Sequence, residues 1–136
     1  MKNTRLIIGL LSIILFAYNA VNAADKQFSV LVSVPYENEF TGRVKSFVSR
    51  ELRELPDVKL VDKLSRRKGE YFISIVAVPL KLASGATVGI AVSYVFQEGD
   101  WIGHNVLAGS PDDLKSLCEK IVSTFDIDLL EPSRHK

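Results

Sequence analysis

The hydrophobic positions of the chain change their period several times, and each change marks a new element. Apolar and polar residues alternate over 28–34, which is typical of a strand with one face more buried than the other. Over 41–54 the apolar positions instead recur every three or four residues, as on one face of a helix. Pro56 ends this helix, because proline disfavours helical geometry in the residue before it. A short strand is predicted at 58–61.

The second half of the chain predicts three consecutive strands. Short turns separate three strand-like runs, at 71–80, 87–96 and 101–108. Such spacing predicts an antiparallel meander. In the middle run one alternating set is bulky and should point toward the helices: Val88, Ile90, Val92, Tyr94 and Phe96. The first run is apolar on both faces, so the pattern leaves open whether the set that begins with Tyr71 or the set that begins with Phe72 points outward.

The last predicted element is a helix with a clear start. Ser110 can cap it, Pro111 suits its first turn, and apolar residues then repeat at helical spacing as far as Phe125. A short polar tail should follow. The predicted order is therefore β-α-β-β-β-β-α. Two helices with one apolar stripe each most simply cover the same face of a mixed sheet, so we expect an α/β (α+β) domain of about five strands, with the first two strands parallel.

The amino-terminal residues have the pattern of an export signal. Basic residues precede an uncharged apolar run at 6–17, and small residues at 21 and 23 suit cleavage by a signal peptidase. The apolar run is shorter than the roughly 20 residues that span a bilayer, which favours a cleaved signal over a retained anchor helix. We therefore expect a signal peptide at 1–23, a single domain at 24–136, and an exported protein that is periplasmic or secreted.

Charge and cysteine content narrow the classes of partner. The chain has 17 basic and 16 acidic residues, and a nearly neutral domain has no overall field that attracts nucleic acid or anionic lipid. We therefore expect no nucleic-acid partner, and contact with a membrane only through the signal segment. Cys118 is the only cysteine, so no disulfide can form within the chain. It falls in phase with the apolar face of the last helix, where a thiol usually serves as inert packing.

The sequence lacks the motifs of catalysis and of cofactor binding. Its two histidines, His104 and His135, are far apart, and a single cysteine gives no spacing for a zinc or copper site. His104 lies between Ile102 and Val106 on one face of a strand, where a histidine is more often packed or hydrogen-bonded than a ligand. There is no G-x-S-x-G elbow and no glycine-rich phosphate loop. We therefore predict a protein that is not an enzyme and holds no metal or cofactor.

The loop between the first strand and the first helix is the best candidate for a small-ligand site. Tyr36, Glu37, Glu39 and Arg43 follow the carboxyl end of a predicted parallel strand, where open α/β sheets often bind ligands. The competing interpretation is a plain helix-entry turn, because carboxylates also favour the start of a helix. A small-ligand-binding or enzymatic domain with its site at this loop is the alternative function.

The sheet face opposite the helices is the leading candidate for binding a partner. In the run 87–96 the residues out of phase with the bulky set are small and would form a flat surface: Thr87, Gly89, Ala91, Ser93 and Val95. An apolar set of the neighbouring strand should lie beside them, and an exposed apolar patch usually indicates a protein partner. The competing interpretation is that the amino-terminal residues or the tail after Phe125 cover this face.

The order of elements resembles a known group of envelope domains. FSVLVSV in the first strand, RELRELPDV at the end of the helix, KLVD in the short strand and GEYFISI after a polar link resemble the amino-terminal domain of the TolB translocation protein. The related CsgG and LpoB group of envelope proteins is similar. Such domains usually place a short helix between the second and third strands, and the link here leaves little room for one. The resemblance implies a periplasmic interaction or assembly module rather than an enzyme, whose partner is another envelope protein or a second copy of itself.

Overall fold

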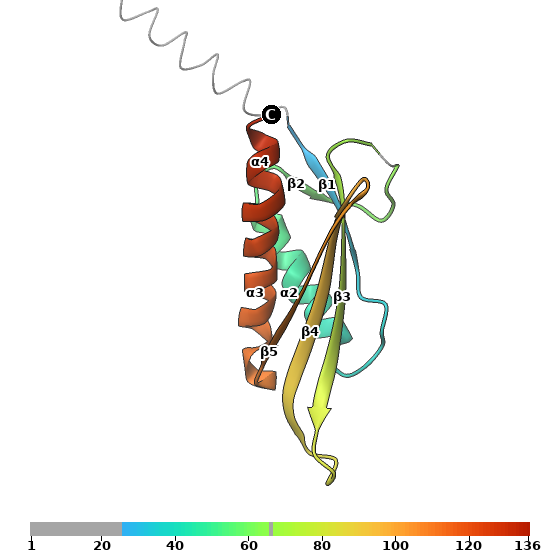
Figure 1. Cartoon of the computed structure of the whole chain (residues 1–136), viewed down its shortest axis with the longest axis vertical. Helices are drawn as coiled ribbons and strands as arrows, with labels where there is room; N and C mark the ends of the chain where they lie inside the picture. The colour runs from blue at the N-terminus through green and yellow to red at the C-terminus, as the bar shows by residue number, and fades with distance from the viewer. Residues whose placement is uncertain (1–25, 66) are drawn as a thin grey trace, which may run out of the picture.

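The computed structural model describes residues 26–65 and 67–136, and its elements follow the predicted order (Figure 1). They are β1 (Phe28–Ser33), α2 (Thr41–Glu54), β2 (Val58–Leu60), β3 (Glu70–Lys81), β4 (Thr87–Glu98), β5 (Trp101–Gly109), a 3₁₀ turn (Pro111–Asp113), α3 (Leu114–Phe125), a π-helical turn (Asp126–Leu130) and α4 (Glu131–Arg134). The predicted signal peptide lies outside the described residues. Within the described ranges, no helix has both the length and the apolar character needed to cross a membrane.

The strands form one mixed five-stranded sheet in the order β2-β1-β3-β4-β5. β1 pairs in parallel with both β2 and β3, whereas the pairs β3–β4 and β4–β5 are antiparallel. Figure 1 shows α2 and α3 side by side on one face of this sheet. The predicted fold class, the parallel first unit and the antiparallel meander are therefore confirmed. The link between β2 and β3 contains no helix in the residues that the structure describes.

The hydrophobic core lies between the sheet and the two helices. The ring of Tyr71 is buried in this core, with edge-on contacts to Phe28 and Phe125 at centroid distances of 5.8 and 5.4 Å. The sequence left open which alternating set of β3 points outward. Tyr71 is buried and Phe72 is only partly buried, so the set that begins with Phe72 points outward. The sheet's contribution to the core also includes Val30, Ile73, Ile75, Ala77, Ile90, Val92, Tyr94 and Phe96.

The prediction was wrong for one residue of the bulky set on β4. Val88 is 56% exposed, although Ile90 to Phe96 are buried at every second position as predicted. The pairing of β3 with β4 shifts register between Leu80 and Lys81, close to Val88. In Figure 1 this end of the hairpin also projects beyond the helices. Val88 therefore lies past the helical layer against which it would have packed.

The helical structure does not end at Phe125, where we expected a short polar tail. It continues through the π-helical turn and α4, and Leu129 and Leu130 are buried in the core. Leu129 follows Phe125 by four residues and so extends the apolar stripe of α3. Acidic residues and Pro132 between 126 and 132 give this segment its polar appearance. The competing interpretation that this tail covers the outer sheet face is therefore wrong.

Candidate functional site

The sheet face opposite the helices carries the predicted partner-binding residues. We call it the open face, because in the described part of the chain its residues are partly buried or exposed, apart from Gly89. The register of β1, β3, β4 and β5 defines it as Ser29, Leu31, Ser33, Glu70, Phe72, Ser74, Val76, Val78, Leu80, Gly89, Ala91, Ser93, Val95, Gln97, Ile102, His104, Val106 and Ala108. The face is thus built from alternate residues of neighbouring strands.

Four of the five predicted partner-binding residues lie on the open face. Ala91 sits at its centre, between Val78 of β3 and Ala108 of β5. Ser93 and Val95 follow on the same side of β4, and Gly89 precedes them opposite Leu80. The fifth, Thr87, lies beyond the register shift of the hairpin, where the alternation of faces is interrupted.

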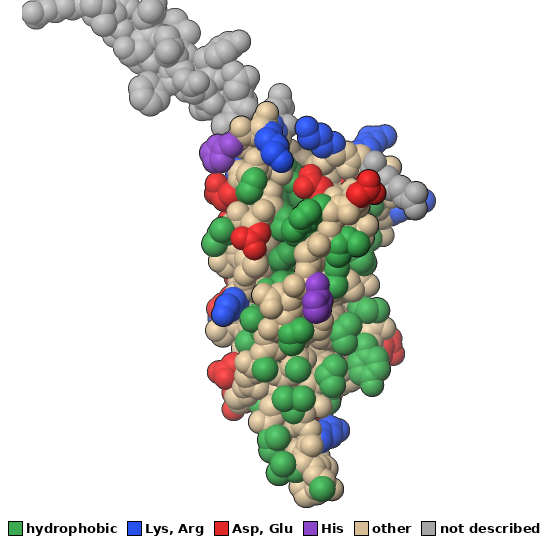
Figure 2. All heavy atoms as spheres, viewed as in Figure 1, with side chains coloured by type: hydrophobic (Ala, Val, Ile, Leu, Met, Phe, Trp, Pro, Cys, Tyr) green, Lys and Arg blue, Asp and Glu red, His purple; other side chains and the backbone are tan. Residues whose placement is uncertain are grey.

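Bulky apolar side chains flank the small residues of β4. On β3, Val78 and Leu80 are 43% and 44% exposed, and on β5, Ile102 and Val106 are 63% and 51% exposed. Figure 2 shows hydrophobic side chains at the surface of the lower half of the molecule, where Figure 1 places the β3–β4 hairpin. Exposed apolar side chains on one face of a sheet are typical of a contact with another macromolecule.

His104 takes part in the open face through a hydrogen bond to Ser93. Its Nε2 lies 3.1 Å from the hydroxyl oxygen of Ser93 on β4. The prediction of a packed or hydrogen-bonded histidine is confirmed. A nucleophilic serine would also need a group that orients the histidine, and no described carboxylate bonds to this ring. Among the described residues, no three His, Cys, Asp or Glu side chains form a group that could hold a metal ion.

The four residues of the alternative loop site are exposed. Tyr36 is 56% exposed, and Glu37, Glu39 and Arg43 also lie at the surface. The guanidinium of Arg43 lies over the ring of Phe47, 5.9 Å from its centroid. This contact holds Arg43 along the outside of α2.

Asn38, which the sequence did not single out, shapes this loop. Its side chain donates to the carbonyl oxygen of Ala77 at 2.6 Å and accepts from the backbone N–H of Phe40 at 2.8 Å. Its own N–H donates to the hydroxyl of Thr41 at 2.9 Å. These bonds tie the loop to β3 and hold Phe40 in the core. An asparagine just before a helix start is typical of such turns and could have been recognised from the sequence.

Clefts lie near the end of the sheet where β1 begins, away from the four loop residues. One of them has a volume of about 780 Å³ and is bounded by Arg67, Lys68, Glu70 and Glu98 among others. Glu70 also accepts hydrogen bonds from the backbone N–H groups of Ser65 and Arg67, at 2.7 and 2.9 Å. This carboxylate therefore orders the link between β2 and β3.

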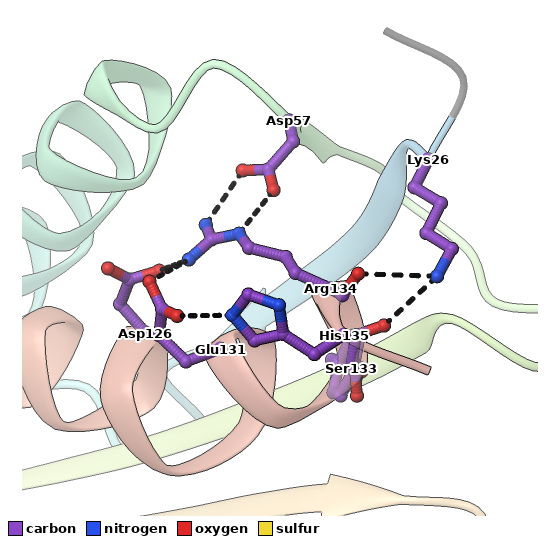
Figure 3. Close-up of polar contacts among 8 residues, drawn as sticks. Lys26, Asp57, Asp126, Glu131, Ser133, Arg134 and His135 are labelled. Atoms are coloured by element: carbon purple, nitrogen blue, oxygen red, sulfur yellow. Dashed lines mark hydrogen bonds and ion pairs between the residues drawn. The ribbon is translucent and has the colours of Figure 1, made fainter. Parts of the chain in front are cut away.

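A cluster of charges, which the sequence did not predict, holds the carboxyl end of the chain to the start of β2 (Figure 3). Arg134 donates two hydrogen bonds to the carboxylate of Asp57, at 2.6 and 2.9 Å. Its Nη1 also lies 2.8 Å from Asp126 and 3.1 Å from Glu131. We call these four residues the clasp. The hydrogen bond from Arg134 lowers the pKa of Asp57, and the same bond raises the pKa of Arg134.

Two further contacts hold the same segment. The ammonium group of Lys26 donates to the carbonyl oxygens of Ser133 and Arg134, at 3.5 and 3.4 Å. The hydroxyl of Tyr71 donates to that of Ser133 at 2.9 Å, and burial raises the pKa of this phenol. These contacts join the two ends of the described fold, and their role is structural.

Comparison with known proteins gives a distant structural likeness. No family model matches the chain, and no curated protein matches it. The PelC dodecamer from Paraburkholderia phytofirmans is similar with 17% identity and a TM-score of 0.46, over 71% of this chain and 86% of that one. A single-residue variant of the same PelC dodecamer gives 18% identity and a TM-score of 0.45, over 71% and 84%. At this level the likeness carries no functional argument, and the resemblance to the TolB group stays a prediction.

Proposed function

We propose that this protein is an exported, periplasmic or secreted module that binds another envelope protein or a second copy of itself, without catalysing a reaction. The observation that carries the proposal is the open face. One face of the five-stranded sheet packs on the helices, while the other presents apolar side chains on both sides of the small residues of β4. Covering such a face with a partner removes apolar surface from water, which favours association.

The size of this effect indicates how large the contact must be. Val78, Leu80, Ile102 and Val106 are each about half exposed, so burying the remainder contributes roughly 1 kcal/mol per side chain. A gross gain of roughly 4 kcal/mol only matches the lower range of the cost of association. A stable complex must therefore also cover the partly buried neighbours on β3 and β4, or add hydrogen bonds at the rim of the sheet.

The test places a charge at the centre of the open face. Ala91→Arg should leave folding intact, because substitutions outside the core usually change stability by no more than about 0.5 kcal/mol. It should abolish any complex formed through this face, since an unpaired buried charge is costly at an interface. Ser116→Arg is the matched control, because it puts the same side chain on an exposed position of α3.

The measurements are sedimentation velocity of the purified protein and pull-down from envelope extract, each paired with circular dichroism. The proposal expects a complex that survives Ser116→Arg and is lost with Ala91→Arg. If Ala91→Arg does not fold, Val78→Lys repeats the test at a position that is 43% exposed on the same face. Complexes that persist in folded open-face variants would overturn the proposal.

A further inference from the structure

The two edges of the sheet differ in how they are protected against pairing with another strand. β2 is a short edge of three residues and carries Lys59. β5 is an edge of nine residues, contains neither proline nor a Lys, Arg, Asp or Glu side chain, and pairs with β4 without a register shift. Short length, charge, proline and bulges are the devices by which natural sheets block edge pairing. β5 has none of them.

The backbone of β5 also presents regularly spaced donors and acceptors. In an antiparallel pair, residues alternate between bonding the neighbouring strand and pointing away from it. The N–H of Val106 bonds the side-chain oxygen of Asn105 at 2.7 Å, which places Val106 in the set that points away from β4. Every second residue from 102 to 108 belongs to this set. In Figure 1 no other element crosses in front of β5.

Two copies of β5 are complementary in size when they pair about a two-fold axis. Asn105 is the middle residue of the strand, so an antiparallel pair centred there aligns the whole length of β5. In that register Ile102 lies opposite Ala108 of the second copy, and Leu107 lies opposite Gly103. Three large side chains, those of Trp101, Ile102 and Leu107, therefore each meet a glycine or an alanine, whereas Val106 lies opposite His104. The residues that point away from β4 would exchange up to about eight backbone hydrogen bonds.

We propose that β5 pairs antiparallel with β5 of a second copy of this chain, so that the two sheets become continuous. The inference rests on the proposed assembly function for its context and names one partner for it. Edge pairing uses the backbone of β5, whereas the open-face contact uses side chains of β3, β4 and β5, so that either can fail while the other holds.

Trp101 provides a built-in probe of this contact. It is the only tryptophan, it is 51% exposed, and its ring lies across Gly103, where an added methyl group would collide with it. In the centred register Trp101 faces Gly109 of the second copy, where no side chain blocks it. Pairing should cover the indole, so its emission should shift to shorter wavelength as the protein concentration rises.

Cysteine cross-linking tests the register. The pair centred on Asn105 brings residue 105 of both copies opposite each other with Cα atoms about 4.5 Å apart, within the range of a disulfide. Ala108→Cys is the matched control on the same strand, since the two copies of residue 108 would lie about 20 Å apart at roughly 3.4 Å per residue. The native Cys118 is buried and stays out of the reaction. Asn105→Cys should form dimers at least about tenfold faster than Ala108→Cys under mild oxidation.

Val106→Pro tests the hydrogen bonds, because proline lacks the N–H that points away from β4 and is tolerated at a sheet edge. Sedimentation should show dimerisation weakened at least about tenfold, with the Trp101 shift lost and circular dichroism retained. If Val106→Pro does not fold, Asn105→Lys places two like charges opposite each other at the two-fold axis, and its side chain does not belong to the open face.

Three results decide between the two surfaces. A dimer lost with a folded edge variant but kept in Ala91→Arg supports edge pairing. A dimer lost with Ala91→Arg but kept in the edge variants overturns edge pairing and supports the open face. A monomeric protein in which Asn105→Cys cross-links no faster than Ala108→Cys overturns edge pairing and leaves the open face to bind a different protein.

Discussion

Replacing Arg134 by methionine removes the cation of the clasp while keeping much of its apolar stem. The carboxylate of Asp57 then loses both hydrogen bonds from the guanidinium, and Asp126 loses its cation. Oδ1 of Asp126 is buried without a hydrogen bond, because its 2.8 Å contact with Arg134 has the distance of an ion pair but not hydrogen-bond geometry. The variant therefore leaves two partly buried carboxylates without compensation.

The exposure of these side chains sets the magnitude. Arg134, Asp57 and Asp126 are 23%, 21% and 26% exposed. They lie between surface pairs, which contribute about 0–1 kcal/mol, and buried pairs, whose disruption costs about 3–5 kcal/mol. We expect a loss of about 2 kcal/mol in the free energy of unfolding, which lowers Tm by roughly 8 °C in a domain of this size.

Urea unfolding at pH 7, followed by circular dichroism, measures this loss. Arg53→Met is the control, because Arg53 is an exposed arginine near the end of α2 and its replacement should change stability by no more than about 0.5 kcal/mol. A loss for Arg134→Met no larger than that for Arg53→Met would refute the reasoning.

Unfolding measured at low pH separates the electrostatic contribution of Arg134 to stability from its packing contribution. The pKa of Asp57 is lowered in the folded protein, so its pairing contributes stability above the unfolded pKa of about 3.9. That contribution is lost as the pH falls through the lower folded pKa. The difference between wild type and Arg134→Met should therefore shrink below about pH 4. A difference that stays constant into strong acid would show that the arginine acts through packing.

Two further predictions concern the core and the export signal. Burial raises the pKa of the Cys118 thiol to about 11, so a thiol reagent at pH 8 should label the native protein slowly and the denatured protein fast, whereas fast native labelling would contradict the core assignment. Cys118→Ser should cost about 1–3 kcal/mol, measured by urea unfolding, because it places a hydroxyl among apolar side chains. Protein recovered from a periplasmic fraction should begin at Ala24 by intact mass, while a full-length chain in the membrane would indicate a retained anchor.

Local periodicity was sufficient to assign the faces of β4. Because strand residues alternate between faces, the contrast between bulky Val92 and Tyr94 and small Ala91 and Ser93 predicts which set packs on the helices. The structure buries the first pair and leaves the second only partly buried. The same local rule could not assign β3, which is apolar on both faces, nor Val88, whose environment depends on how far the helices extend along the hairpin.

Long-range pairing lay outside what the sequence could predict. Asp57 and Arg134 are 77 residues apart, and each alone looks like an ordinary charge in a polar segment. Their contact depends on the π-helical turn and α4, which bring the carboxyl end back to the start of β2. Asn38 differs, because its turn is local and its residue type in front of a helix carries a recognisable signal.

Shifted pKa values mark the parts of the described fold where burial and specific charges act most strongly on titratable groups. In the residues described, such shifts occur at Asp57 and Arg134 in the clasp and at Tyr71 and Cys118 in the core, and each has a structural cause. The open face and β5 instead present apolar side chains and, at the edge, backbone groups that no other strand of the described residues pairs with. These are the features by which a sheet recognises another protein chain, through burial of its face and through hydrogen bonding at its edge.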